Sequence, residues 1–331
     1  MFGLEYPIVC AGMGGVALAE LAAAVSEAGG LGTLGLAALG REGILSEITA
    51  ARSRTKKPLA VNLLVPFLRP GLIDLVADTS IQAVTLFWDD ARQHADSIAR
   101  LHRASIKVIW QCGSADEARW AKDAGADAVI AQGFEAGGHV RGEVTTFALI
   151  PEVRDAIGDL PMIAAGGIGD GRGLAAALAL GADGAVFGTR FLGSTESVAH
   201  PRYKDRILRA HASETMHTTL FDIGWPDAPH RVLRTGVVDQ WEQAGRPASG
   251  QRPGEGETIA VSRRPDVEIP LVNYSVMPPT DYLEGEVDGL PFYAGQSCTM
   301  VREIAPAGEI VRRIAAEASD VIAKRLAAML R

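Results

Sequence analysis

PMIAAGGIGDGRGLAAALALGADGAVFGTR, residues 161 to 190, contains a complete strand–helix–strand unit. The apolar runs PMIAA and GAVF at its two ends are short and almost free of polar residues, which is typical of parallel strands buried on both faces. Between them, Leu174, Ala177 and Leu178 repeat at helical spacing, and the pattern ends at Gly181. The stretch therefore predicts two neighbouring parallel strands joined by a helix.

The same kind of apolar run recurs along most of the chain. The runs are PIVCAG from Pro7, LGTLG from Leu31, LAVNLLV from Leu59, AVTLFW from Ala83, KVIWQC from Lys107, AVIAQG from Ala128, PMIAAGG from Pro161 and GAVFGTR from Gly184. Most successive runs start 21 to 28 residues apart, and one interval is 33 residues. Helical patterns fill these intervals, and Ser114 with Glu117 marks a capping box at the start of one. Eight such units predict an α/β protein with a (β/α)₈ TIM barrel, and a doubly wound open sheet is the alternative.

The regular spacing ends after the eighth run. We expect residues 1–205 to form the barrel and residues 206–295 to form a smaller inserted domain that covers it as a lid or binds substrate. The insert contains a polar stretch, GRPASGQRPGEGET, that suggests a mobile loop. Residues 296–331 would return to the barrel, where a final amphipathic helix closes the wall.

Composition limits the function classes. The chain has 331 residues, 32 basic and 40 acidic ones for a net charge of −8, and no Lys/Arg cluster, which argues against a nucleic-acid partner. The N-terminus lacks the basic start of a signal peptide, and no apolar run reaches the ~18 residues of a membrane span. Cys10, Cys112 and Cys298 form no CxxC pair, so neither a disulfide framework nor a metal site is indicated. We expect a cytoplasmic protein that acts on a small molecule, with a homodimer as a candidate assembly.

Two glycine-rich segments follow the seventh and eighth runs. AAGGIGDGRG contains Gly166 and Gly167, and FGTR contains Gly188 and Thr189. In a barrel, the loops after these two strands commonly bind phosphate through bare backbone N–H groups. Tight turns without a ligand are the alternative. A dinucleotide fingerprint fits less well, because no strand–GxGxxG–helix with a later acidic residue is present.

The other strand ends carry small or neutral polar groups. These are Gly12 and Met13 after the first run, Asn62 in the third, Gln111 in the fifth and Gln132 in the sixth. Amide groups that point into one cavity suit a flat heterocycle with alternating donors and acceptors. Each of them alone could equally be a satisfied buried amide.

Together, the segments GMGGVALAELAAAVSEAGGLGTLG, VNLLVPF, QGFEAGGH, AAGGIGDGRGLAAALALGADG, FGTRFL and YAGQS resemble the nitronate monooxygenase (2-nitropropane dioxygenase) family. The resemblance covers nearly the whole chain and is weakest from about 222 to 290. It implies an FMN-dependent barrel whose inserted domain is mostly helical. The flavin contacts that it implies are Gly12, Met13, Asn62, Gln132, Gly137, Gly167, Val186, Phe187, Gly188 and Thr189, with Gln296 near the flavin from the C-terminal side; Gln111 and Gly166 join them from the strand-end pattern.

The stretch QGFEAGGHVRG contains the candidate catalytic residue. The resemblance implies that His139 is the catalytic base beside the flavin ring, and we expect its pKa to lie near neutrality. The glycines before it would let the loop press against the cofactor. A histidine that merely caps the loop is the alternative. The remaining histidines are read as surface or packing residues: His94, His102, His200, His211, His217 and His230.

The leading hypothesis is oxidation of alkyl nitronates by FMN and O₂ to a carbonyl compound and nitrite, with His139 taking the α-proton of a nitroalkane. The alternative is an NAD(P)H-dependent flavin reductase, because enoyl-acyl-carrier-protein reductase II and certain quinone reductases share the barrel and the GGH histidine. A barrel that binds flavin or phosphate without catalysis is a third hypothesis. The first motif, CAGMGG, lacks the proline that many relatives have before the methionine, and VRG after His139 is one residue longer than the usual form. Both departures concern the rim of the site.

Overall fold

The computed structural model of the protein describes residues 1–37, 39–264 and 267–330. Within these residues, eight parallel strands form one sheet in the order β1-β9-β8-β6-β5-β4-β3-β2. The strands are β1 (Ile8–Cys10), β2 (Gly32–Gly35), β3 (Leu59–Leu64), β4 (Ala83–Phe87), β5 (Lys107–Cys112), β6 (Ala128–Gln132), β8 (Met162–Ala165) and β9 (Gly184–Phe187). The sheet closes between β1 and β2, where Cys10 N donates to Leu31 O and Leu31 N donates to Ile8 O, both at 2.9 Å. The predicted barrel is confirmed, and the open-sheet alternative is excluded.

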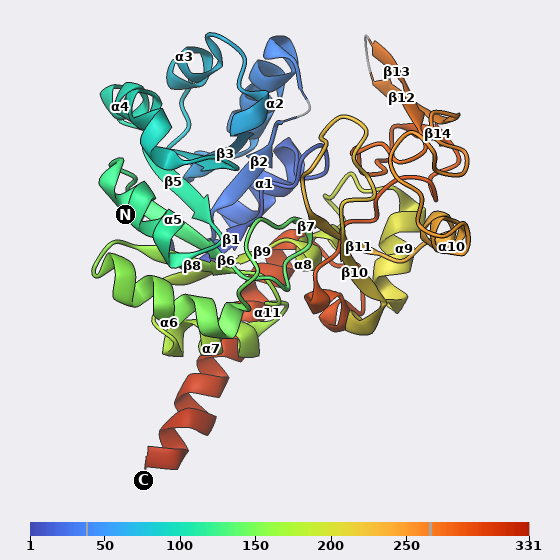
Figure 1. Ribbon diagram of the computed structural model, residues 1–331. Helices are drawn as coiled ribbons and strands as arrows, with labels where there is room; N and C mark the ends of the chain where they lie inside the picture. The colour runs from blue at the N-terminus through green and yellow to red at the C-terminus, as the bar shows by residue number, and fades with distance from the viewer. Residues whose placement is uncertain (38, 265–266, 331) are drawn as a thin grey trace.

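Helices alternate with the strands and cover the outside of the barrel (Figure 1). They are α1 (Ala19–Glu27), α2 (Arg41–Arg54), α3 (Leu72–Ala77), α4 (Ala95–Arg103), α5 (Ala115–Asp123), α6 (Thr146–Ile157), α7 (Gly171–Ala179) and the short α8 (Thr189–Leu192). The last long helix, α11 (Ala307–Asp320), packs against both α1 and α7 and closes the wall. A Cβ on Gly171 would lie 2.4 Å from Ala318 N, so the absence of a side chain allows α7 and α11 to approach.

Local signals set the ends of these helices. At the start of α7, Asp170 Oδ1 accepts hydrogen bonds from Arg172 N at 3.0 Å and Gly173 N at 3.2 Å. At the start of α5, Ser114 Oγ accepts from Glu117 N at 3.2 Å. Glu117 reaches back one residue further than a standard capping box, because its Oε2 accepts from the backbone N of the residue before Ser114. In both helices, the side chain at the N-cap position thus accepts hydrogen bonds from backbone N–H groups that an α-helix leaves unpaired at its start.

The inserted segment differs from the mostly helical domain that we expected. It contains β10 (Thr215–Thr218), β11 (His230–Leu233), α10 (Gly236–Gln243), β12 (Thr258–Arg264), β13 (Val267–Val272) and β14 (Leu283–Gly285), and it follows α9 (Pro201–Arg209). These strands form two three-stranded sheets. One is β13-β12-β14, and the other is β10-β11-β7, in which the short strand β7 (Gly138–His139) comes from the barrel loop after β6. The runs TIAVS and VEIPLV are rich in β-branched residues, which favour strands over helices. Figure 1 shows this segment on one side of the barrel, with the β12–β13 hairpin at its upper end.

Two features of the insert matter for the site. The short strand β7 (Gly138–His139), in the loop after β6, pairs with β11 and so joins the barrel to the insert. The polar stretch 246–257, which we expected to be mobile, is held by buried polar contacts of Arg252. Among the described helices, none combines the length and apolar character that crossing a membrane requires.

Candidate active site

A cavity of about 530 Å³ lies at the carboxyl ends of the barrel strands, between the barrel and the insert. Its size is in the range of cavities that hold cofactors and small ligands. The barrel contributes strand ends and glycine-rich loops. The insert contributes Ile223, Gly224, Trp225, the segment 275–278 and Tyr293. Both parts of the chain therefore form the wall.

Most of the candidate residues from the sequence meet in this cavity. Its wall includes Gly12, Met13, Asn62, Gln111, Gln132, Gly137, His139, Gly166, Gly167, Val186, Gly188 and Thr189. Phe187 and Gln296 are the exceptions among the candidates.

Phe187 is fully buried in the core between strands and helices, with its ring 6.4 Å from that of Phe191. Successive residues of a strand point to opposite faces, so Val186 faces the cavity and Phe187 faces away. The side chain of Gln296 is exposed, while its backbone N donates to Glu135 O at 3.0 Å. Ser297 lines the cavity in its place.

The loops after β8 and β9 form a cradle with little side-chain bulk. Gly166 and Gly167 have φ values of +100° and +71°, a left-handed conformation that favours glycine. No hydrogen bond to the N–H group of Gly167 is present within the described part of the chain. Next to them, Gly188 lines the same cavity, and a Cβ there would touch only Ala11, at 3.4 Å. Free N–H groups on glycine backbone suit an anion such as a phosphate.

The middle of the cavity contains a polar group without a partner. Gln132 is 6% exposed, and its Nε2 donates to His139 O at 2.9 Å. Its Oε1 is buried and has no hydrogen-bond partner in the described chain. A buried acceptor without a donor is costly, so a ligand N–H at this position would stabilise the site. With the glycine cradle, this amide fits FMN, which carries both a phosphate and a ring N–H.

The segment around His139 requires its glycines. Gly138 has a φ of +73°, and a Cβ on Gly137 would lie 2.2 Å from Gly295 N. Both would strain or clash with any other residue. They allow β7 to pair with β11, where His139 is opposite His230. The close passage of two backbones therefore explains why paired glycines precede the histidine.

Aromatic side chains surround the His139 ring. Trp225 stacks on it with ring centroids 4.1 Å apart and an interplanar angle of 28°. Trp88 makes an edge contact at 5.7 Å, and Tyr293 lies at 5.5 Å. Phe67 contacts Trp225 at 5.0 Å. We call Phe67, Trp88, Trp225 and Tyr293 the aromatic wall. It gives this end of the cavity an apolar surface.

The expected neutral-range pKa of His139 is wrong in this environment. Burial, with a smaller contribution from the neighbouring His230, lowers its pKa to about 3. His230 is fixed as a neutral ring, because its Nδ1 lies 2.9 Å from Ala228 O and its Nε2 accepts from Phe221 N at 3.3 Å. Burial lowers the pKa of His230 to about 4. His139 is therefore an uncharged imidazole, and its Nε2 is shielded from solvent without a partner in the described chain.

Sequence reasoning missed the aromatic wall and the role of His230. The sequence signal for Trp88 was a bulky aromatic residue directly after the apolar run of β4. In the structure its φ is +86°, a conformation that is unusual for such a residue. Trp225 and His230 gave no such signal, and Tyr293 stood only as the first residue of the YAGQS segment. They reach His139 only because the insert folds back over the barrel.

The chain is a closed (β/α)₈ barrel whose strand ends surround a cavity with glycine-rich loops and an uncharged histidine, an arrangement typical of barrel enzymes. The chain belongs to the nitronate monooxygenase family, whose model matches residues 1–71 and 69–317.

Proteins with several different names are similar to this chain in sequence or in fold. The chain is 41% identical over 249 residues to a (3aS,4S,5R,7aS)-5-hydroxy-7a-methyl-1-oxo-octahydro-1H-indene-4-carboxyl-CoA dehydrogenase of Mycobacterium tuberculosis, covering 74% of this chain and 68% of the relative. FabK from Thermotoga maritima has a TM-score of 0.78 at 32% identity, over 99% of this chain and 97% of FabK. A nitroalkane oxidase from Streptomyces ansochromogenes has a TM-score of 0.75 at 30% identity, over 97% of each chain.

Proposed function

We propose that the chain is an FMN-dependent enzyme that oxidises alkyl nitronates with O₂ to a carbonyl compound and nitrite, with His139 as its catalytic residue. The observation that carries this proposal is His139 itself, which lines the cavity that contains the glycine cradle and whose buried Nε2 has no partner in the described chain. Membership of the nitronate monooxygenase family and the likeness to a nitroalkane oxidase support it.

The cavity residues divide into two groups that would hold the cofactor. The backbone of Gly166, Gly167 and Gly188 would bind the phosphate, and Thr189 adds a hydroxyl whose oxygen accepts from Gly295 N at 3.0 Å. Gln132 would accept a hydrogen bond from the flavin ring through its free Oε1. When bound, FMN supplies the electron acceptor and the reactivity with O₂.

His139 would act on the proton of the substrate. An uncharged imidazole is in the form that accepts a proton, so Nε2 can take the α-proton of a neutral nitroalkane. The products of that transfer are an imidazolium and a nitronate anion in contact. Because an opposite charge raises the pKa of a histidine, the anion would offset the effect of burial on His139. A nitronate formed before binding would need no such transfer.

A second candidate is the dehydrogenation of an acyl-CoA thioester. The 41% identity to a carboxyl-CoA dehydrogenase favours it. The cavity also favours it, because its wall includes apolar residues of the insert, Met277 and Ile269 on β13, that a larger substrate could contact. In this reaction His139 would remove the proton from the carbon next to the thioester carbonyl.

Product analysis separates these reactions. The FMN-loaded protein is supplied with O₂ and, in separate assays, with a short alkyl nitronate, an acyl-CoA, or NADH and NADPH. The proposal expects O₂ uptake with nitrite and a carbonyl compound from the nitronate. Formation of an unsaturated acyl-CoA without nitrite would replace it with the second candidate. If the protein oxidises NADH or NADPH but neither the nitronate nor the acyl-CoA, a flavin reductase activity would replace the proposed function.

A further inference from the structure

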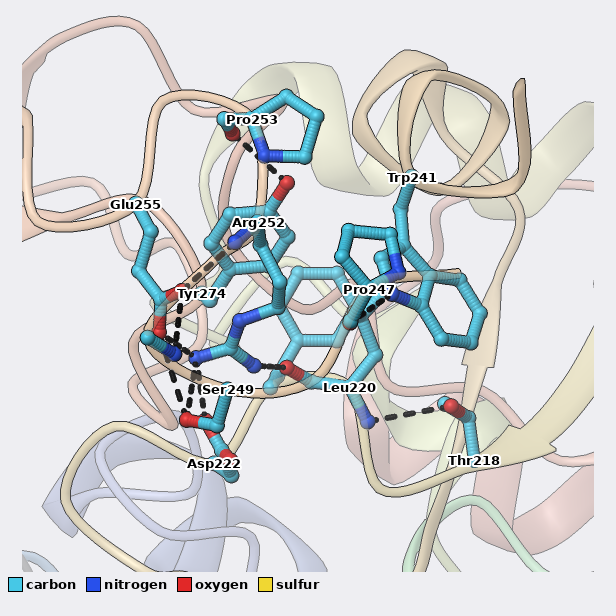
Figure 2. Close-up of polar contacts among 12 residues, drawn as sticks. Thr218, Leu220, Asp222, Trp241, Pro247, Ser249, Arg252, Pro253, Glu255 and Tyr274 are labelled. Carbon is cyan, nitrogen blue, oxygen red and sulfur yellow. Dashed lines mark hydrogen bonds and ion pairs between the residues drawn. The ribbon is translucent and has the colours of Figure 1, made fainter. Parts of the chain in front are cut away.

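Figure 2 shows Arg252, a buried arginine of the polar stretch, with Leu220, Asp222 and Glu255 around its guanidinium. The Arg252 side chain is 3% exposed, and its Nη2 forms an ion pair with Asp222 Oδ1 at 2.8 Å, without the geometry of a hydrogen bond, and another with Glu255. Its Nη1 donates to Leu220 O at 2.6 Å, and its Nη2 donates to Ser249 Oγ at 3.1 Å. One guanidinium thus joins the polar stretch to both ends of the segment 220–222.

The same guanidinium also contacts the other side of the insert. It lies 4.5 Å from the ring centroid of Tyr274, whose hydroxyl donates to Pro253 O at 2.8 Å. Ile223 N donates to Tyr274 O at 3.1 Å, and Val276 N donates to Ile223 O at 2.9 Å. Ile223 and Val276 both line the cavity. Arg252 therefore holds two cavity segments against each other.

The segment that Arg252 holds presents Trp225 to His139. Trp225 N donates to Asp222 O at 2.9 Å, which closes a tight turn, and Gly224 within it has a φ of +104°. The Trp225 side chain is buried. Its ring stacks on His139 and contacts the rings of Phe67 and Trp88. The carboxylate that pairs with Arg252 and the carbonyl that makes the turn belong to the same residue, Asp222.

Burying an arginine is costly, and a buried ion pair often stabilises a fold less than an apolar replacement of the same volume would. The hydrogen bonds of Arg252 to Leu220 O, Ser249 and Glu255 do supply direction, because the planar guanidinium fixes its acceptors at set positions. This is the property needed to hold a turn in one place beside a reacting group.

We infer that Arg252 is a positioning residue for the reaction centre: through Asp222 it fixes the turn that holds Trp225 on His139, and Trp225 in turn selects which substrates reach that histidine. The inference rests on the proposed function in placing His139 at the reacting group. The placement of Trp225 itself can be tested without any substrate.

The first test observes Trp225 directly. The FMN-loaded protein labelled with 5-fluorotryptophan should give five ¹⁹F signals, one for each tryptophan. Trp225→Phe and Trp241→Phe assign two of them. Arg252→Met should shift or broaden the Trp225 signal. The control Arg246→Met removes a 64% exposed arginine of the same stretch, and it should move only the signal of Trp241, over whose ring Arg246 lies.

The second test is kinetic and uses Arg252→Lys, which keeps the positive charge but lacks the planar set of donors. This variant can also be used if Arg252→Met does not fold. It should change the kcat/KM ratio between a bulky and a short nitronate by at least about threefold, within the range of coupling between neighbouring residues. In a Trp225→Phe background the same change should have no further effect on that ratio.

An unmoved Trp225 signal in folded Arg252→Met, or equal effects of Arg252→Lys in both backgrounds, would overturn the inference. If the signal moves as expected but no nitronate is turned over, the proposed function fails while the positioning of Trp225 stands.

Discussion

Replacing His139 with alanine should damage catalysis far more than folding. The ring makes no side-chain hydrogen bond in the described structure, and its main contact is the stack on Trp225. Losing such an aromatic pair costs about 0.5–1.5 kcal/mol of unfolding free energy in addition to the loss of the apolar area that it buries. Losing a general base typically costs about 10²–10⁴ in rate, or about 2.7–5.5 kcal/mol of transition-state stabilisation. The variant should therefore bind FMN and unfold near the parent.

The assay compares turnover on a neutral nitroalkane with turnover on its preformed nitronate, for the parent and for His139→Ala. The large loss is expected on the nitroalkane only, because the nitronate has already lost its proton. His102→Ala is the matched control, since His102 lies on α4 away from the cavity and pairs with Asp127. It should leave both rates unchanged.

Two results would refute this reasoning. Equal losses on the nitroalkane and the nitronate would mean that His139 acts on charge or orientation and not on the proton. Unchanged rates on both would leave it a loop histidine with no part in the reaction.

The remaining predictions concern the cofactor, the pH dependence and the buried arginine. The purified protein should be yellow and release FMN on denaturation. Gly188→Ala should weaken FMN binding, measured by flavin fluorescence, roughly tenfold or more (about 1.4 kcal/mol). The control Gly236→Ala, which lies outside the cavity, should leave FMN binding unchanged. The unfolded chain binds a proton on each imidazole near pH 6.5, whereas the folded His139 does so only near pH 3, so the unfolding free energy should fall as pH drops below about 6.5. His139→Asn should reduce that slope by up to about 1.4 kcal/mol per pH unit in urea titrations, and an unchanged slope would contradict the low pKa. Arg252→Met should cost about 3 kcal/mol of unfolding free energy, because it removes the buried cation between the partly buried carboxylates of Asp222 and Glu255. Exposed Arg246→Met should cost under about 1 kcal/mol, and similar losses for both would contradict this prediction.

The barrel was predictable because its signals are local. Each strand is a short apolar run, and glycine or a capping side chain marks the helix ends, as at Gly181 and Asp170. The insert was less predictable, because its two sheets are made by pairings between separated segments. The β-branched run of β12 was a usable signal that the resemblance to a family with a helical insert outweighed.

The site was predictable where it depends on the barrel. The strand-end glycines and amides meet in one cavity because parallel strands end at the same edge. Strand alternation alone would have separated Val186 from Phe187. The pKa of His139 could not be obtained in this way, since it depends on burial by Trp225 and on His230, both of which are distant in the chain.

Anaerobic mixing of the FMN-loaded protein with an alkyl nitronate tests the central claim most directly. The flavin absorbance should bleach in a single turnover, and readmitted O₂ should restore it with release of nitrite and a carbonyl compound. A flavin that stays oxidised with nitronate but bleaches with NADH or NADPH would contradict the proposed reaction.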